Sequence, residues 1–297
     1  MMQEIAALPT EVHILIGFLF SLLIGSFLNV VIYRYPKMIF YAWTMQSRQW
    51  LDSENDVTNN DEGKDETSTP PSLSKPASHC RVCKSPVKAW QNIPIVSYAL
   101  LRGKCATCKT PIGLRYPFVE LLTATLCALV IYKLGWTLAA LFAVFLTWVL
   151  VALSFIDFDH KILPDEIVLP VLWLGLSLNV FHIYTNLESA VIGAIGGYLC
   201  FWLVFKAFLL ITKKEGMGHG DFKLMSLLGA WLGWQFLPQI IFLSTLVGSV
   251  FGISMMIANR SGRDTQIPFG PYIAFAGWIA MLWGNDINQT YLNYAGL

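Results

Sequence analysis

The chain has 297 residues, of which 55% are hydrophobic and only 13% are charged. A soluble globular chain carries about 25% charged residues, so this composition indicates a membrane protein and excludes disorder over the whole length. The net charge of +1 gives no basic surface for nucleic acid, and no nucleic-acid partner is expected. Six cysteines are too few for a secreted scaffold built on disulfides.

Eight apolar runs predict an all-α polytopic membrane protein with about eight transmembrane helices. The first run has 22 residues, which is enough to cross ~30 Å of hydrocarbon. The sixth and eighth runs are short, so tilted or partly re-entrant helices are alternatives there. In chain order the runs are 12–33, 118–134, 138–156, 167–184, 190–211, 224–236, 240–258 and 269–283.

Lysine and arginine residues predict the orientation. With the N-terminus outside, segments 34–117, 157–166, 212–223 and 259–268 face the cytoplasm, and with Lys206 they hold 19 of the 20 basic residues. Three regions follow: a first transmembrane helix at 1–33, a cytoplasmic loop at 34–117 and a transmembrane region at 118–297. Within the loop, the stretch 52–69 carries seven acidic residues and is interpreted as a flexible insertion without an assigned role.

Two CxxC pairs in this loop predict a metal site. Four thiolates in tetrahedral geometry favour zinc, and a site closed by four cysteines leaves no open position for catalysis, so its expected role is structural. Disulfides or free thiols are the alternative, and a reducing cytoplasm argues against disulfides. Gly103 is expected to provide the positive φ that such a turn often needs. The predicted ligands are Cys80, Cys83, Cys105 and Cys108; Cys127 and Cys200 are expected to be small buried residues, and His79 to face solvent.

Two acidic segments, 155–166 and 216–223, lie at the predicted cytoplasmic edge of the membrane. Two crossings separate Asp157 from Asp221, so both return to the same face. Two carboxyl groups a few ångströms apart share a proton, and such a pair activates water against a peptide carbonyl without a metal. The glycines at 216, 218 and 220 leave room beside Asp221 for an extended substrate backbone.

Structural roles for these acids are open alternatives. Asp165 and Asp221 are each placed to cap a helix, and Asp159 is placed as a solvated loop residue. Lys161 or Lys223 could pair with any of them. Spacing alone does not decide between a catalytic pair and caps or ion pairs. Glu120, near the inner end of the second run, would be costly to bury without a partner.

Taken together, these motifs resemble the bacterial prepilin peptidases, the type IV leader peptidases that also N-methylate their products. The resemblance covers nearly the whole chain. The Gly-x-Gly-Asp element is shared with presenilin-like proteases, and the set of motifs is specific. The matching motifs are Gly25–Arg34, the two CxxC pairs, Arg115–Glu120, Ile156-Asp157 through Leu163-Pro164-Asp165, Gly218-x-Gly-Asp221-x-Lys223, and Pro268-Phe-Gly-Pro271.

The resemblance implies a bifunctional enzyme of the bacterial inner membrane. Asp157 and Asp221 match the catalytic aspartates of the family, and the four loop cysteines match its zinc ligands. The implied substrates are type IV prepilins and type II secretion pseudopilins, cut at the cytoplasmic face and then methylated with S-adenosylmethionine. The site for the methyl donor stays unassigned, because the sequence has no strand–Gly-x-Gly-x-x-Gly–helix pattern.

Two rival classes remain open from the sequence. One is a proton-coupled transporter in which Glu120, Asp157 and Asp221 relay protons, although no repeated halves are visible. The other is a non-enzymatic assembly scaffold organised by the cysteine loop, in which the aspartates are replaceable.

Overall fold

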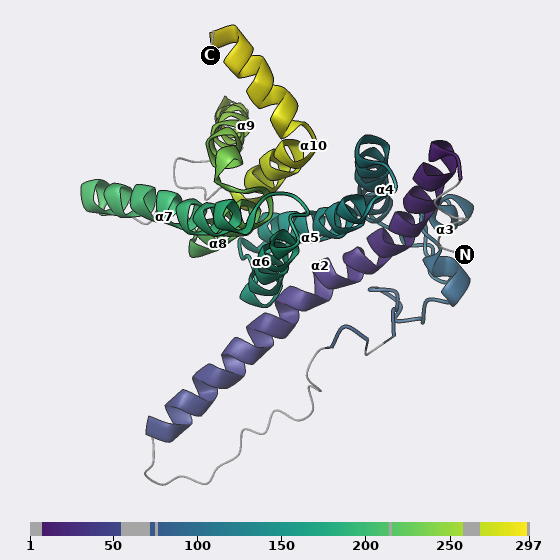
Figure 1. Cartoon of the computed structure of the whole chain (residues 1–297). Coiled ribbons are helices and arrows are strands. Elements are labelled where there is room, and N and C mark those ends of the chain that lie inside the picture. Colours follow the sequence, from purple (N-terminus) through teal and green to yellow (C-terminus); the bar gives the residue numbers. More distant parts are fainter. Residues whose placement is uncertain (1–7, 55–71, 75–76, 214–215, 258–267, 296–297) are drawn as a thin grey trace. The chain divides into compact units, whose positions relative to one another are not determined.

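The computed structural model describes residues 8–54, 72–74, 77–213, 216–257 and 268–295. It divides into two compact units, Met1–Phe18 with Thr125–Leu297 (unit 1) and Leu19–Ala124 (unit 2). The described residues are almost all helical (Figure 1), with two isolated β-bridges among them. This confirms the predicted all-α class. From residue 55 on, the predicted acidic insertion lies outside the described residues.

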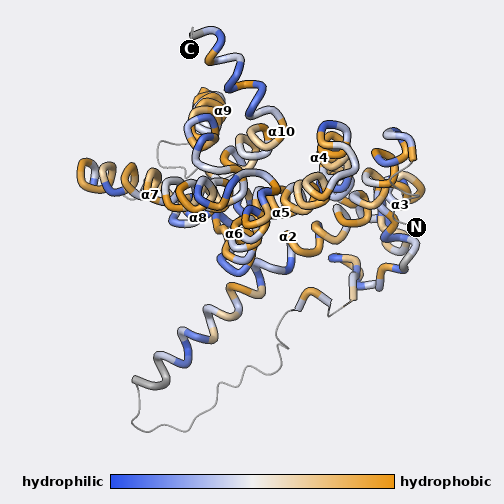
Figure 2. Tube along the Cα trace, viewed as in Figure 1, coloured by the Kyte–Doolittle hydropathy of each residue, from blue (hydrophilic) through white to orange (hydrophobic). Residues whose placement is uncertain are grey.

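Five described helices are long and apolar enough to cross a membrane. They are Thr10–Trp50, Arg115–Leu134, Leu138–His160, Leu187–Thr212 and Trp234–Ile257. The helices at the fourth, sixth and eighth predicted runs are not among them, and the one at the eighth run turns hydrophilic toward the C-terminus (Figure 2). The polytopic architecture is confirmed, whereas the count of eight crossings stays a prediction.

The first helix is longer than the sequence predicts. Helix α2 covers Thr10–Glu54, 45 residues, and passes through Pro36 without ending near Tyr33. The prediction ended the helix at the first charge after the apolar run. A charge marks where a chain leaves hydrocarbon, but it does not end a helix. Pro36 removes one backbone hydrogen bond and crowds the carbonyl four residues before it, yet the helix continues past it.

Unit 1 is arranged around the short helix α8 (His219–Leu232), which packs against α6 (Asp165–Val180), α7 (Leu187–Thr212) and α10 (Gly270–Ala295). Its 14 residues rise about 21 Å, less than the ~30 Å of a hydrocarbon core. All its residues from Asp221 onward except Lys223 are buried. Helix α8, which contains most of the sixth apolar run, is therefore buried from residue 221 onward among the other helices of unit 1, and its crossing of the membrane stays a prediction.

Helices α7 and α8 cross with their backbones close together. Gly193 and Gly197, four residues apart on α7, face α8, and a Cβ on Gly197 would lie 2.7 Å from the carbonyl oxygen of Met225. Ser226 Oγ donates to the carbonyl of Ala194 across the same crossing at 2.7 Å. Small residues permit such close approach between apolar helices. The crossing fixes the helix that carries Asp221.

A buried amide holds the other end of α8. Asn179 Nδ2 donates to the carbonyls of Ala230 and Trp231 at 2.8 and 2.9 Å, which are among the helix-end carbonyls that lack an intrahelical partner. Asn179 Oδ1 accepts the backbone N–H groups of Tyr184 and Thr185, both at 3.1 Å. One side chain thus ties α8 to the connection between α6 and α7.

The remaining helices complete the two units. Unit 1 also contains α5 (Leu138–His160), η2 (Trp234–Phe236) and α9 (Leu237–Ile257). Unit 2 contains most of α2, the short helices η1 (Ala89–Asn92) and α3 (Val96–Leu100), and the first turns of α4 (Arg115–Leu134). Within unit 2, Asn29 Nδ2 donates to the carbonyl of Tyr116 at 3.1 Å and joins α2 to α4.

Candidate active site and metal site

The two predicted aspartates meet in unit 1. Asp157 lies in the last turn of α5 and Asp221 in the first turn of α8, and their residues are only 5% and 6% exposed. The backbone of Gly270, which binds Asp157, and that of Gly220, next to Asp221, both approach the side chain of Leu163, so the two carboxyl groups lie in the same region of unit 1. Because such neighbours cannot both ionise easily, the arrangement can present one acid and one base.

Asp157 has a backbone partner that sequence reasoning missed. Its Oδ2 accepts the N–H of Gly270 at 3.0 Å. Gly270 begins α10, and an N–H in a first turn has no intrahelical acceptor and is free to bind a carboxylate. A Cβ on Gly270 would lie 2.7 Å from that same oxygen. The Pro268–Pro271 motif was noted only for its resemblance, although a glycine at a helix start is a recognisable signal for such an approach.

Leu163 lies between the backbones on either side of the pair. It belongs to the short connection from α5 to α6, which begins where Lys161 takes a left-handed conformation (φ 56°) and donates its N–H to the carbonyl of Asp157 at 2.8 Å. A Cβ on Gly220 would lie 2.8 Å from Leu163 Cβ, and one on Gly270 would lie 3.3 Å from Leu163 Cδ1. At Gly220 the missing side chain therefore makes room for Leu163, not for a substrate.

The structure bears on two of the alternative roles of the acids, helix capping and ion pairing. Pro164 and Gly218 occupy the N-cap positions of α6 and α8, so neither Asp165 nor Asp221 is an N-cap. Asp165 instead receives Lys223 Nζ on both carboxylate oxygens, at 2.7 and 2.6 Å. Pairing by Lys223 is thereby confirmed for Asp165. Asp159 is exposed in the last turn of α5.

The four loop cysteines come together in unit 2. Their Sγ atoms all lie within 4.8 Å of one another, and those of Cys80 and Cys108 are 3.8 Å apart. Four sulfurs at about 2.3 Å from a tetrahedral zinc are about 3.8 Å from one another, so the spacing fits. His79 contributes no ligand atom; its Nδ1 lies 3.0 Å from the carbonyl of Ala77. Of the remaining cysteines, Cys127 is buried and Cys200 is half-buried.

The two CxxC turns have matching backbones. The N–H of Cys80 donates to Ser85 O and that of Cys105 to Thr110 O, at 2.9 and 2.8 Å. A residue with positive φ follows each pair, Lys84 at 57° and Lys109 at 60°. Gly103 has φ +66°, as predicted, and a Cβ there would lie 2.8 Å from the hydroxyl of Tyr98. Both turns thus form from short local segments.

Two of the cysteine sulfurs have a hydroxyl group within hydrogen-bond distance. Ser85 Oγ is 2.9 Å from Cys83 Sγ, and Thr110 Oγ1 is 3.2 Å from Cys108 Sγ. Hydrogen bonds from the hydroxyl and the backbone N–H of Thr110 lower the pKa of the Cys108 thiol to about 6. A thiolate is the form that binds metal, so these partners support a metal site.

Glu120 is buried with a partner. Its Oε2 accepts the N–H of Ile95 at 2.9 Å, just where the loop before α3 takes a positive φ of 57°. The residue that seemed costly to bury therefore holds the loop within unit 2.

These features define a polytopic membrane protein with a buried carboxylate pair of the kind that aspartic peptidases use, and with a separate four-cysteine cluster. The chain matches the bacterial peptidase A24 N-terminal domain over residues 19–134 and the type IV leader peptidase family over residues 144–253. It belongs to the type IV leader peptidase family.

Curated relatives match over almost their full length. The chain is 50% identical to the prepilin leader peptidase/N-methyltransferase of Pseudomonas aeruginosa over 283 residues, 95% of this chain and 94% of that protein. It is 51% identical to the protein of the same name from Aeromonas hydrophila, over 93% of this chain and 92% of that one. The prepilin leader peptidase/N-methyltransferase of Neisseria gonorrhoeae is 48% identical, over 87% of this chain and 86% of that protein. No solved structure matches the chain.

Proposed function

We propose that this chain is an aspartic-type membrane endopeptidase that removes the leader from type IV prepilins and type II secretion pseudopilins, and then N-methylates the new N-terminal residue. Membership of the type IV leader peptidase family and the names of the relatives support both activities. The observation that carries the peptidase assignment is the buried pair of carboxyl groups at Asp157 and Asp221.

The pair cleaves a peptide bond by moving protons. The ionised carboxylate takes a proton from water as the water oxygen bonds to the carbonyl carbon, and the protonated partner gives its proton to the carbonyl oxygen. In the resulting diol, the C–N bond breaks as the nitrogen takes a proton from the carboxyl group that first accepted one. One diol hydroxyl gives its proton back to the other carboxylate, which restores the starting protonation states. The Gly270 N–H holds one oxygen of Asp157 in place through these steps. No covalent intermediate is needed.

The four cysteines are the proposed zinc ligands. Their spacing fits a tetrahedral ion, and Cys80, Cys83, Cys105 and Cys108 together fill its coordination. When bound, zinc supplies a cross-link between the two CxxC turns. A closed site of this kind holds the loop of unit 2 in shape and takes no part in the cleavage step.

Methyl transfer is proposed on the strength of the relatives' names, with S-adenosylmethionine as the methyl donor. The new α-amine of the cleaved product would bond to the methyl carbon as the methyl–sulfur bond breaks, the neutral thioether S-adenosylhomocysteine would leave, and the methylated amine would lose a proton. The cysteine loop and the adjoining membrane surface are the proposed region for this activity.

The proposed setting is the bacterial inner membrane, with the N-terminus outside and the carboxylate pair at the cytoplasmic face. The distribution of lysine and arginine supports this orientation. Helices long and apolar enough to cross a membrane lie in both units, which supports a membrane location.

The test is leader cleavage by purified protein. Wild type, Asp157→Asn and Asp221→Asn are reconstituted in lipid vesicles with a prepilin, and leader loss is followed by mass spectrometry. Only the wild type should release the leader. A transporter or a scaffold would release none, so an intact prepilin with the wild type contradicts the proposal. A transporter relay through Glu120 is also disfavoured, because its carboxylate accepts the backbone N–H of Ile95 and so has a structural role.

A further inference from the structure

A bidentate ion pair connects the two segments that carry the aspartates. Lys223 Nζ lies 2.7 and 2.6 Å from the two carboxylate oxygens of Asp165. Lys223 is two residues after Asp221 on α8, and Asp165 is the first residue of α6, directly after the connection that leaves Asp157. The pair thus closes a loop that runs from one aspartate to the other.

Leu163 lies within this loop, between the backbone of Gly220, next to Asp221, and that of Gly270, which binds Asp157. Leu163 packs on Gly220, next to Asp221, and on Gly270, whose N–H binds Asp157. Lys161 starts the connection with a left-handed turn, and the ion pair fastens its far end. With both ends fixed, Leu163 is held as a spacer between the backbone that carries Asp221 and the one that binds Asp157.

We propose that Lys223 and Asp165 form a positioning pair that keeps Leu163 in place and so sets the spacing of the two aspartates for cleavage. The inference rests on the proposed peptidase function. Neither residue touches the reacting atoms; the pair acts through Leu163 and the two glycine backbones. Misplacement by about 1 Å costs roughly 10²-fold in rate when reacting groups must be aligned.

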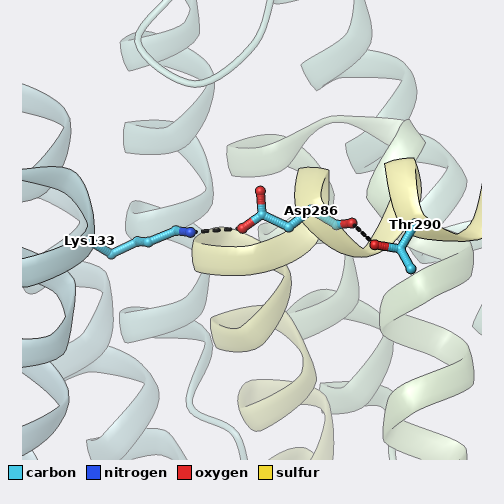
Figure 3. A network of polar contacts seen from close by, with 3 residues as sticks. All are labelled: Lys133, Asp286 and Thr290. Carbon is cyan, nitrogen blue, oxygen red and sulfur yellow. Dashed lines mark hydrogen bonds and ion pairs between the residues drawn. The ribbon is translucent and has the colours of Figure 1, made fainter.

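A second ion pair provides a matched control. Lys133 Nζ and Asp286 Oδ2 are 2.7 Å apart in unit 1, joining α4 to α10, and Thr290 donates to the carbonyl of Asp286 beside them (Figure 3). The side chains of Lys133 and Asp286 are 36% and 60% exposed, and those of Lys223 and Asp165 are 29% and 48% exposed, so the two pairs are similarly accessible to solvent. Exposed pairs contribute little to the free energy of unfolding. Both pairs should therefore affect stability slightly, and only one should affect catalysis.

The test measures kcat and KM for prepilin cleavage by the full-length protein in lipid vesicles. Lys223→Met should lower kcat by about 10–10²-fold with little change in KM, because the spacing of the catalytic groups changes but the substrate contacts do not. Lys133→Met should leave both constants within about twofold. Lys223→Arg keeps the charge and the bidentate contact, so it should retain most of kcat.

A double-mutant cycle separates positioning from other roles. Combining Lys223→Met with Asp165→Asn should lower kcat no further than Lys223→Met alone, since the same contact is already lost. Multiplied effects, a raised KM with unchanged kcat, or a loss no greater than that of Lys133→Met would each overturn the inference. If Lys223→Met fails to fold, the inference is tested with Asp165→Asn and Lys223→Arg instead. Asp165→Asn must then have a lower kcat than the wild type, and Lys223→Arg must have a kcat close to that of the wild type. The failure of the peptidase proposal itself is distinct, because it shows as cleavage by Asp221→Asn.

Discussion

The carboxylate pair and the cysteine cluster are built in opposite ways. Asp157 and Asp221 are 64 positions apart, and the Gly270 amide that binds Asp157 is 113 positions away from it. Each half of the cysteine cluster forms within six residues, from Cys80 to Ser85 and from Cys105 to Thr110. The first site depends on helix packing throughout unit 1, whereas the second depends on two short turns and the ion they are proposed to bind.

This difference predicts two kinds of sensitivity. Changes that shift helix ends in unit 1 should reduce cleavage and leave the metal in place, because the cysteine turns use no residue of unit 1. Changes in the turns should release the metal and leave the carboxylate pair formed. The following substitutions test that separation, in order of decreasing expected effect on cleavage.

Replacement of either aspartate should have the largest effect. Asp157→Asn and Asp221→Asn should each reduce leader cleavage by about 10³-fold or more, because an amide can neither accept the proton of water nor share one. Metal content, measured by atomic emission, should stay at the wild-type level in both. Asp159→Asn is the control: this residue is exposed, and most of the activity should remain. Loss of metal from Asp221→Asn would mean that the two sites are not independent.

Gly270→Ala should disturb the pair without removing a carboxyl group. The added Cβ would lie 2.7 Å from Asp157 Oδ2 and 3.1 Å from its Cγ, so the carboxyl group must move. Cleavage should fall about 10–10²-fold, as expected for misaligned catalytic groups. Gly113→Ala adds the same methyl group where no atom lies within 4 Å, and its cleavage rate should match the wild type. Equal rates for the two variants would show that the Gly270 contact is unimportant.

Cys108→Ser should have the opposite effect to the aspartate substitutions: the metal should be lost and most of the cleavage should remain. Loss of one of four thiolates should release the metal and loosen the loop around residues 78–110, so methylation should fall more than cleavage. The measurement is metal content together with the masses of the cleaved and the methylated product from the same reaction. Wild-type protein that holds no zinc would remove the basis of this prediction, and cleavage lost as fully as in Asp221→Asn would contradict the separation of the two sites.

Glu120 should produce the smallest change in cleavage. Glu120→Ala leaves the Ile95 N–H without its acceptor, which costs about 1–3 kcal/mol for a buried donor. Unit 2 should lose thermal stability and release metal more readily to a chelator. Glu120→Gln keeps an acceptor oxygen and should behave like the wild type in both measurements. A strong loss of function in Glu120→Gln would instead favour a role for its ionisation, as in a proton relay.

The two sites also differ in how far the sequence predicts them. The cysteine cluster could be predicted directly, because CxxC spacing describes a local turn and the structure places all four sulfurs together. The carboxylate pair could be predicted only to the same membrane face, from the parity of two crossings. Its details depend on contacts that no local pattern contains: the Gly270 amide, and Leu163 between two glycine backbones.

Helix boundaries were predicted less well, for physical reasons. The end of α2 was placed near Tyr33, because hydropathy reports the edge of hydrocarbon and not the end of the helix. The run at 224–236 was predicted as a crossing that could be tilted or partly re-entrant, because hydropathy does not distinguish a helix covered by protein from one that faces lipid. The structure shows that α8 packs against α6, α7 and α10, and whether it crosses the membrane stays a prediction.

The most direct test compares leader cleavage by Asp221→Asn and Cys108→Ser in one assay. Both proteins are purified and reconstituted in the same lipid vesicles, and the fraction of prepilin that has lost its leader is followed over time by mass spectrometry. The carboxylate pair is the proposed cleavage machinery, so Asp221→Asn should leave the prepilin intact while Cys108→Ser still releases the leader. Cleavage by Asp221→Asn at the wild-type rate would contradict that assignment.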